Sequence, residues 1–276
     1  MLSNWQALRL YLARKALDPG ALAVFGTVWL IYSGIRALAN EYGLADSSQE
    51  VLQIDRWLGA GSSPTERLQA AVYVPGDFGW IDYLAFAIHL SYFLVPFGAG
   101  IGIWFFSKYR GGSPEFVDYV AGTGVVLFGG VLINFLIPTA PPWLQARVDG
   151  DLEIVRLLPL LVADVSGDRL NGIVGADPNS RAAMPSLHVG ITALVVLFLG
   201  RIRLLLGVAA MVYVVAMALS LMYLGEHYLI DLIVGSLLAL LGLYAIRCGW
   251  PYQLVARIVP PVRSPAPSLE ASQSDD

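Results

Sequence analysis

The stretch from Arg181 to Gly200, RAAMPSLHVGITALVVLFLG, decides how this chain folds. A short polar cluster that contains Ser186 and His188 opens the stretch, and an apolar run of helix length follows. Such a run can cross a bilayer as a helix, whereas ionisable side chains such as imidazole are costly to bury there. We therefore predict a membrane helix whose first turn carries polar side chains with a function at the membrane boundary.

The composition predicts an integral membrane protein. Hydrophobic residues make up 57% of the 276 residues and charged residues only 14%, well below the roughly 25% of soluble domains. The net charge of -4 provides no basic field, so we expect no nucleic-acid partner. The single cysteine, Cys248, excludes an internal disulfide and a thiolate metal cage.

Six segments are long and apolar enough to cross a membrane, so the predicted fold class is all-α, a polytopic membrane helical bundle. The six predicted transmembrane helices are residues 21–40, 80–106, 118–137, 183–200, 204–224 and 227–246. They form one membrane domain, residues 21–247. Residues 1–20 mix apolar residues with Arg9, Arg14 and Lys15, which predicts an amphipathic segment on the membrane surface. Residues 248–276 are rich in proline and serine, which predicts a largely disordered tail.

Positive residues predict the orientation of the bundle. With the N-terminus inside, the short loops that carry Lys108, Arg110, Arg201 and Arg203 lie on the cytoplasmic side. Both termini and the tail are then cytoplasmic, and two long loops, about 41–79 and 138–182, lie outside. We expect a multi-pass protein of the cell membrane.

Three polar motifs that are far apart in the sequence reach the outer face in this topology. Pro185–His188 opens the fourth predicted span, GEHYLIDLIVG (225–235) opens the sixth, and NFLIPTAPPW (Asn134–Trp143) closes the third. An odd number of spans between any two of them would have placed them on opposite faces. The topology therefore predicts one site at the extracytoplasmic face.

His227 and Asp231 have the spacing and chemistry of an activated nucleophile. They lie four residues apart, so they share one face of a helix. A carboxylate beside an imidazole accepts one N–H, leaves the lone pair of the other nitrogen available, and stabilises the imidazolium form. The alternative is a pair that only packs two helices together.

The PSLH motif supplies complementary groups. Pro185 suits the first turn of a helix, and the free backbone N–H groups at this helix start, with the helix dipole, favour an anion beside Ser186 and Leu187. The Ser186 hydroxyl adds a donor, and His188 can act as a general acid. The alternative is a helix start with a hydrated histidine. Taken together, the motifs predict phosphoryl transfer, in which His227 attacks phosphorus, Asp231 orients it and His188 protonates the leaving oxygen.

The motifs AMPSLHVG, YLGEHYLIDL and PTAPPW resemble the type-2 phosphatidic acid phosphatase superfamily. They are most similar to its inositolphosphotransferase branch, typified by fungal inositol phosphorylceramide synthase, and SSPTERLQA and HLSYFLVP are weakly similar to it. The resemblance implies a helical bundle and a mechanism that uses a phosphohistidine and no metal or other cofactor. It also implies the acid role for His188 and the nucleophile and orienting roles for His227 and Asp231.

The sequence departs from the phosphatase pattern at its cationic positions. That pattern has a Lys-x6-Arg-Pro motif, where this chain has Asn134, Pro141 and Pro142, and an arginine six residues before the nucleophile, where it has Leu221. We expect Asn134, Pro141 and Pro142 to line the substrate site nevertheless. The nearest replacements for the missing cations on the outer face are Arg181 and Arg147, which we predict as phosphate contacts.

The predicted function is therefore a lipid phosphotransferase or lipid phosphatase whose partners are a lipid-phosphate substrate, a polyol acceptor or water, and the surrounding membrane lipids. Two rival interpretations remain at this stage. In one, His188 and His227 ligate a metal or haem; in the other, the chain is a non-catalytic scaffold or carrier. His89 is interpreted as a packing residue of the second span. Glu226 either tunes His227 or binds a headgroup, or it only caps the helix.

Overall fold

The computed structural model of this chain describes residues 3–42, 44–150, 152–167 and 181–258. These ranges contain thirteen helices and no strand, apart from an isolated bridge between Thr139 and Ala182, which confirms the all-α prediction. The helices are α1 (Asn4–Lys15), α2 (Gly20–Tyr42), α3 (Ser48–Leu58), α4 (Pro64–Val72), α5 (Trp80–Ser91), α6 (Val95–Tyr109), α7 (Glu115–Leu136), α8 (Pro142–Asp149), α9 (Leu157–Ser166), α11 (Leu187–Ile202), α12 (Leu204–Tyr223), α13 (Leu229–Arg247) and α14 (Trp250–Ile258).

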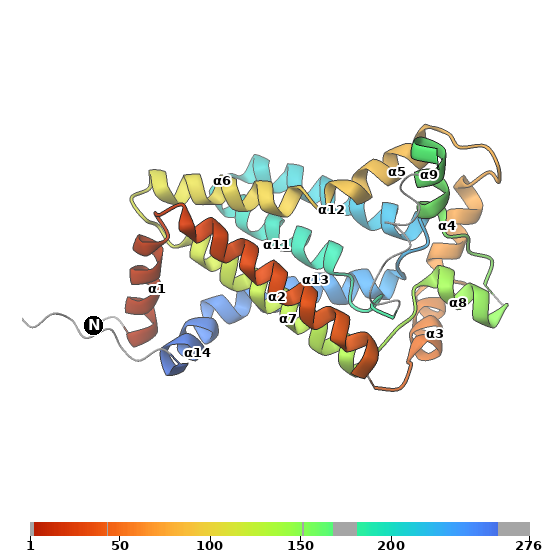
Figure 1. The fold of residues 1–276 in the computed structure, drawn as a ribbon. Helices are drawn as coiled ribbons and strands as arrows, with labels where there is room; N and C mark the ends of the chain where they lie inside the picture. Colours follow the sequence, from red (N-terminus) through yellow and green to blue (C-terminus); the bar gives the residue numbers. More distant parts are fainter. Residues whose placement is uncertain (1–2, 43, 151, 168–180, 259–276) are drawn as a thin grey trace, which may run out of the picture.

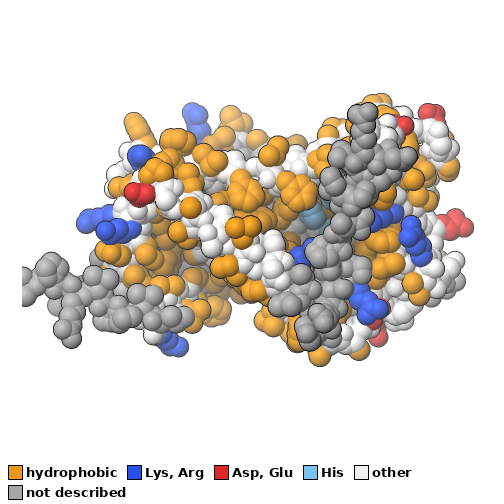
Figure 2. Space-filling model, in the orientation of Figure 1, with side chains coloured by type: hydrophobic (Ala, Val, Ile, Leu, Met, Phe, Trp, Pro, Cys, Tyr) orange, Lys and Arg blue, Asp and Glu red, His pale blue; other side chains and the backbone are white. Residues whose placement is uncertain are grey.

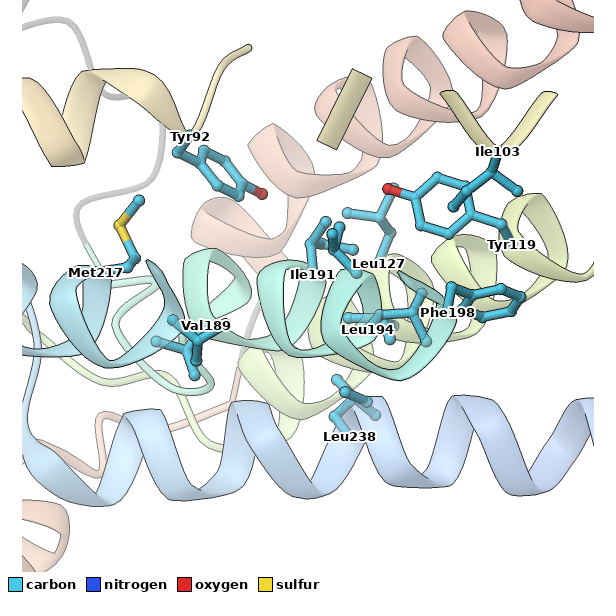
Figure 3. Close-up of a cluster of buried hydrophobic side chains, with 14 of the residues drawn as sticks. Tyr92, Ile103, Tyr119, Leu127, Val189, Ile191, Leu194, Phe198, Met217 and Leu238 are labelled. Carbon is cyan, nitrogen blue, oxygen red and sulfur yellow. The ribbon is translucent and has the colours of Figure 1, made fainter. Parts of the chain in front are cut away.

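The long helices form a bundle with α11 at its centre (Figure 1). Helix α11 packs against α6, α7, α12 and α13, and α2 packs along α7. Ile191 and Leu194 of α11 are fully buried in a core that also contains Leu127 of α7 and Met217 of α12 (Figure 3). Most of the stretch Arg181–Gly200 therefore forms the innermost helix of the protein.

The two ends of the bundle differ (Figure 1). Helices α3, α4, α8 and α9 lie together at one end, and we call them the cap. At the opposite end lie α1 and α14. Helix α3 packs on α13, α4 on α12, and α9 on α5. The sequence analysis treated residues 41–79 and 138–182 as loops and missed these helices, because each is short and only partly apolar, apart from the apolar α9.

The described helices support three to five membrane spans by length and composition. Helices α7, α12 and α13 qualify singly, and the bent pairs α1 with α2 and α5 with α6 qualify as pairs. The sequence analysis expected six spans. Helix α11 has only 16 residues, and the segment predicted as one helix over 80–106 is bent by 49° where α5 ends and α6 begins. Pro96 at the start of α6 lacks an N–H group and cannot continue the hydrogen-bond ladder of α5.

The surface has the pattern of a membrane protein. Figure 2 shows hydrophobic side chains over the middle of one face and most of the charged side chains near its two ends. Helix α1 turns by 112° against α2, and its position along a membrane surface stays a prediction. Helix α14 occupies the start of the predicted tail, where the hydroxyl of Tyr252 donates to Asp118 at 2.6 Å and Arg9 forms an ion pair with the same carboxylate. Residues 259–276 of that tail lie outside the described residues.

Candidate active site

The start of α11 is held by a side-chain cap and by α13. The hydroxyl of Ser186 accepts from the N–H of Val189 at 3.5 Å, and the N–H of Ser186 donates to the carbonyl of Asp231 at 3.0 Å. The helix begins at Leu187, so Pro185 precedes it instead of occupying its first turn. His188 lies in that first turn, where the helix dipole favours an anion.

His227 lies in the turn between α12 and α13, two residues before the helix that was expected to contain it. Its Nδ1 is nevertheless 3.3 Å from Oδ2 of Asp231, and the same oxygen accepts from the N–H of Tyr228 at 2.9 Å. Asp231 is fully buried, and its Oδ1 has no hydrogen-bond partner among the described residues. The carboxylate therefore fixes both the imidazole and the backbone that carries it.

All three histidines of the chain meet at this end of the bundle. The ring centroids of His188 and His227 are 5.8 Å apart, and those of His89 and His188 are 5.1 Å apart. The ring of Tyr92 lies 4.2 Å from that of His188. The three histidines come from α5, from α11 and from the turn before α13, so the bundle brings together residues from three separate parts of the sequence.

His89 was assigned to packing by the sequence analysis, and the structure places it in the histidine cluster. Its side chain is buried, and Nδ1 has no hydrogen-bond partner within the described part of the chain. One sequence signal favoured a site role, because an ionisable side chain inside an apolar span is costly and usually functional.

The segment after α7 holds residue 181 in place. The Asn134 side chain donates from Nδ2 to the carbonyl of Arg181 at 2.7 Å, and the N–H of Thr139 donates to the same carbonyl at 2.9 Å. Pro141 and Pro142, which open α8, are buried. Asn134 thus holds the backbone of the segment that leads into α11, while the side chain of Arg181 is exposed. That Asn134, Pro141 and Pro142 line the substrate site stays a prediction.

Arg147 lies on the surface of the cap. Its guanidinium is 5.2 Å from the ring centroid of Trp143, and it lines a cavity of about 430 Å³ together with Glu66, Tyr73 and Glu153. Its contact with a phosphate at the histidine cluster stays a prediction, as does that of Arg181.

Cap residues that the sequence analysis missed contact the turn that carries His227. The hydroxyl of Thr65 in α4 donates to the carbonyl of His227 at 3.0 Å. Asp55 in α3 accepts from the N–H of Ile230 at 3.3 Å. Arg156, which precedes α9, donates from Nε to Oε1 of Glu226 at 2.9 Å. No spacing rule predicts such contacts, since each joins segments that are distant in the sequence.

Among the described residues, no group of three or more His, Cys, Asp and Glu side chains has an arrangement that could hold a metal ion. What the site offers is an imidazole paired with a buried carboxylate, two further imidazoles and the start of a helix. Those groups suit nucleophilic attack, proton donation and the binding of an anion.

Comparison with known proteins adds one finding. Residues 49–245 match the sequence profile of the PAP2 superfamily. The match begins within α3, the first cap helix, and ends within α13. None of the curated proteins and none of the solved structures that were compared matches the chain.

Proposed function

The chain belongs to the PAP2 superfamily, and on that premise we propose that it is a membrane enzyme that transfers or hydrolyses a lipid-linked phosphate through a phosphohistidine. Membership supports phosphatase or phosphotransferase activity on a phosphate substrate. The observation that carries the mechanism is the 5.8 Å separation of the His188 and His227 rings, with Asp231 buried against Nδ1 of His227.

The arrangement supports a two-step reaction. Nε2 of His227 attacks phosphorus, while His188 gives its proton to the leaving oxygen as the bond from phosphorus to that oxygen breaks. Asp231 stabilises the positive charge that develops on His227. In the second step an acceptor hydroxyl attacks the phosphohistidine, His188 takes the hydroxyl proton, and the bond from phosphorus to His227 breaks. The acceptor is water in a phosphatase and an alcohol in a transferase.

Two observations support a lipid substrate and the transferase branch. The histidine cluster lies at the start of α11 and in the turn before α13, where Thr65 of the cap contacts His227, and Figure 2 shows a histidine side chain next to hydrophobic ones. In addition, the cationic positions of the phosphatase pattern hold Asn134, Pro141 and Leu221. Such a site suits a phosphodiester of single charge, so we propose an inositolphosphotransferase-like enzyme with six spans and an extracytoplasmic site.

The roles of His188, His227 and Asp231 are tested by substitution. Each purified variant is assayed on a panel of lipid phosphates, with and without a polyol acceptor and with and without EDTA. We expect His227→Ala and His188→Ala to lower kcat by several orders of magnitude, because residues that act as a unit fail together. Asp231→Asn should cost less than His227→Ala, since the nucleophile remains. Turnover should survive EDTA.

Trapping of the intermediate provides the control. Wild-type enzyme quenched in alkali after reaction with labelled substrate should carry phosphate on histidine, and His227→Ala should carry none. Retention of more than about a tenth of activity in His227→Ala would show that another residue is the nucleophile.

A further inference from the structure

Arg156 lies beside the residue that precedes the proposed nucleophile. Its Nε donates to Oε1 of Glu226 at 2.9 Å, and Glu226 is adjacent to His227 in the chain. The two side chains are each only 14% exposed. The guanidinium carbon of Arg156 also lies 4.2 Å from the ring centroid of Trp143. An arginine is thus held on two sides, next to the turn that carries His227.

The backbone on both sides of this contact is fixed. The amide of Gln69 accepts from the N–H of Val155 at 2.7 Å and donates to the carbonyls of Val155 and Tyr223, each at 2.9 Å. Gly225 has a φ of +79°, which favours glycine, and a Cβ there would lie 3.0 Å from the carbonyl oxygen of Val155, so the turn packs closely on residue 155. Arg156 therefore has the fixed position that a ligand-binding residue needs.

The guanidinium has binding capacity that the described residues do not use. Its ion pair with Glu226 is made through Nε, and the structure shows no hydrogen bond from either terminal nitrogen of Arg156 to any described residue. A guanidinium offers five N–H donors in a planar fork that matches phosphate oxygens. Glu226, which Arg156 contacts, is adjacent to His227 in the chain, and the His227 ring lies 5.8 Å from that of His188, so the guanidinium lies next to the turn that joins the histidine cluster.

We propose that Arg156 binds the phosphate of the substrate through its terminal nitrogens, while Glu226 and Trp143 position the guanidinium. This assignment rests on the proposed function. It supplies a cation from a position that the superfamily pattern does not use, in a chain that has Asn134, Pro141 and Leu221 where that pattern has cations. A partly desolvated phosphate needs such a charge, since a helix start contributes only about half a unit charge.

The test compares Arg156→Ala, Arg156→Lys, Glu226→Gln and Glu226→Ala, with Arg67→Ala as the control for loss of an exposed cap arginine. We expect Arg156→Ala to lower kcat/KM by roughly ten- to a thousandfold. Arg156→Lys should recover part of the loss, because it keeps the charge and loses the fork. Glu226→Gln should cost less than about tenfold, since it leaves the cation in place.

Binding of orthovanadate, measured as the shift that it causes in the melting temperature of the purified protein, tests the same residue without turnover. The shift should be present in wild type and Arg67→Ala and lost in Arg156→Ala. If Arg156 and Glu226 only formed a structural pair, Arg156→Ala and Glu226→Ala would have equal effects on kcat/KM and would both keep the vanadate shift, and the proposal would be overturned. If the protein were inactive on every lipid phosphate but showed a vanadate shift that depends on Arg156, the proposed function would be wrong and the phosphate site would be supported. A wild type that shows no vanadate shift would overturn the phosphate site.

Discussion

The carboxylate of Asp55 holds the start of α13 from the cap. Asp55 is fully buried, and its two oxygens accept from the hydroxyl of Ser63 at 2.7 Å and from the N–H of Ile230 at 3.3 Å. The N–H of Ile230 belongs to the first turn of α13, which has no partner inside the helix. Burial raises the pKa of Asp55, the two hydrogen bonds oppose that shift, and the charge of Asp231 adds to it.

We expect Asp55→Asn to fold and to gain stability relative to wild type as the pH rises. A carboxyl group whose pKa is higher in the folded than in the unfolded protein adds stability below its unfolded pKa, and that contribution is lost as the pH rises through the folded pKa. The difference in melting temperature between Asp55→Asn and wild type should therefore grow between about pH 4 and pH 7. Asp55→Leu leaves Ser63 and the N–H of Ile230 unpaired and should cost about 1–3 kcal/mol below the unfolded pKa of Asp55, where the wild-type carboxyl group adds its full stability. A difference between Asp55→Asn and wild type that stayed constant with pH would contradict the raised pKa.

At the scale of elements, the site depends on a close crossing of α11 and α13. A Cβ at Gly235 would lie 2.2 Å from the carbonyl oxygen of Ser186, and one at Gly190 would lie 3.1 Å from the carbonyl oxygen of Gly235. The two backbones touch, and the N–H of Ser186 reaches the carbonyl of Asp231. This approach places His188, on α11, against the turn that precedes α13.

Gly235→Ala should separate the two helices. We expect a loss of about 1–3 kcal/mol in the free energy of unfolding, since the new methyl group has only backbone to displace, together with a clear fall in kcat. The control is Gly124→Ala in α7, where a Cβ meets nothing within 4 Å. Melting temperature and turnover are measured for both variants. Equal behaviour of the two variants would show that the crossing tolerates a side chain and does not position the histidines.

At the scale of the whole molecule, the cap lies at one end of the bundle and α1 and α14 lie at the other (Figure 1). Thr65 of the cap contacts the turn that carries His227, so the histidine cluster belongs to the cap end. Lys108, in the last turn of α6, and Arg110, directly after it, lie on the same side of the bundle as α1, because Gly112 in the following connection lies against Ala13 and Arg14. The bias of positive residues in short loops toward the cytoplasm then predicts an extracytoplasmic cap.

Cysteine labelling tests this orientation in a Cys248→Ser background, which removes the one native thiol. Val148→Cys, at a cap position that is 77% exposed, should react with an impermeant maleimide in intact cells. Tyr109→Cys, at the end of α6 and 91% exposed, should react only after permeabilisation. The reverse pattern would place the site on the cytoplasmic side and overturn the proposed topology.

The sequence by itself determined the all-α fold class of the protein and the principal residues of its candidate active site. Apolar runs of helix length identify membrane helices from neighbouring residues alone, and α7, α12 and α13 lie close to the predicted ranges. The contact between His227 and Asp231 was predicted from their spacing, and it is present although His227 lies before α13 and not on it. The proximity of this pair to His188 was predicted from the number of spans between the motifs. In the structure the ring centroids of His188 and His227 are 5.8 Å apart, while the catalytic roles of the two residues stay a prediction.

Only the tertiary structure decided what surrounds these residues. Thr65 bonds the carbonyl of His227 across 162 residues, Asp55 bonds Ile230 across 175, and Arg156 bonds Glu226 across 70. Hydropathy and helix propensity depend on residues a few positions apart, so they carry no information about such pairs. The pairs exist because the cap helices pack on the ends of α12 and α13, and that packing is a property of the folded bundle as a whole.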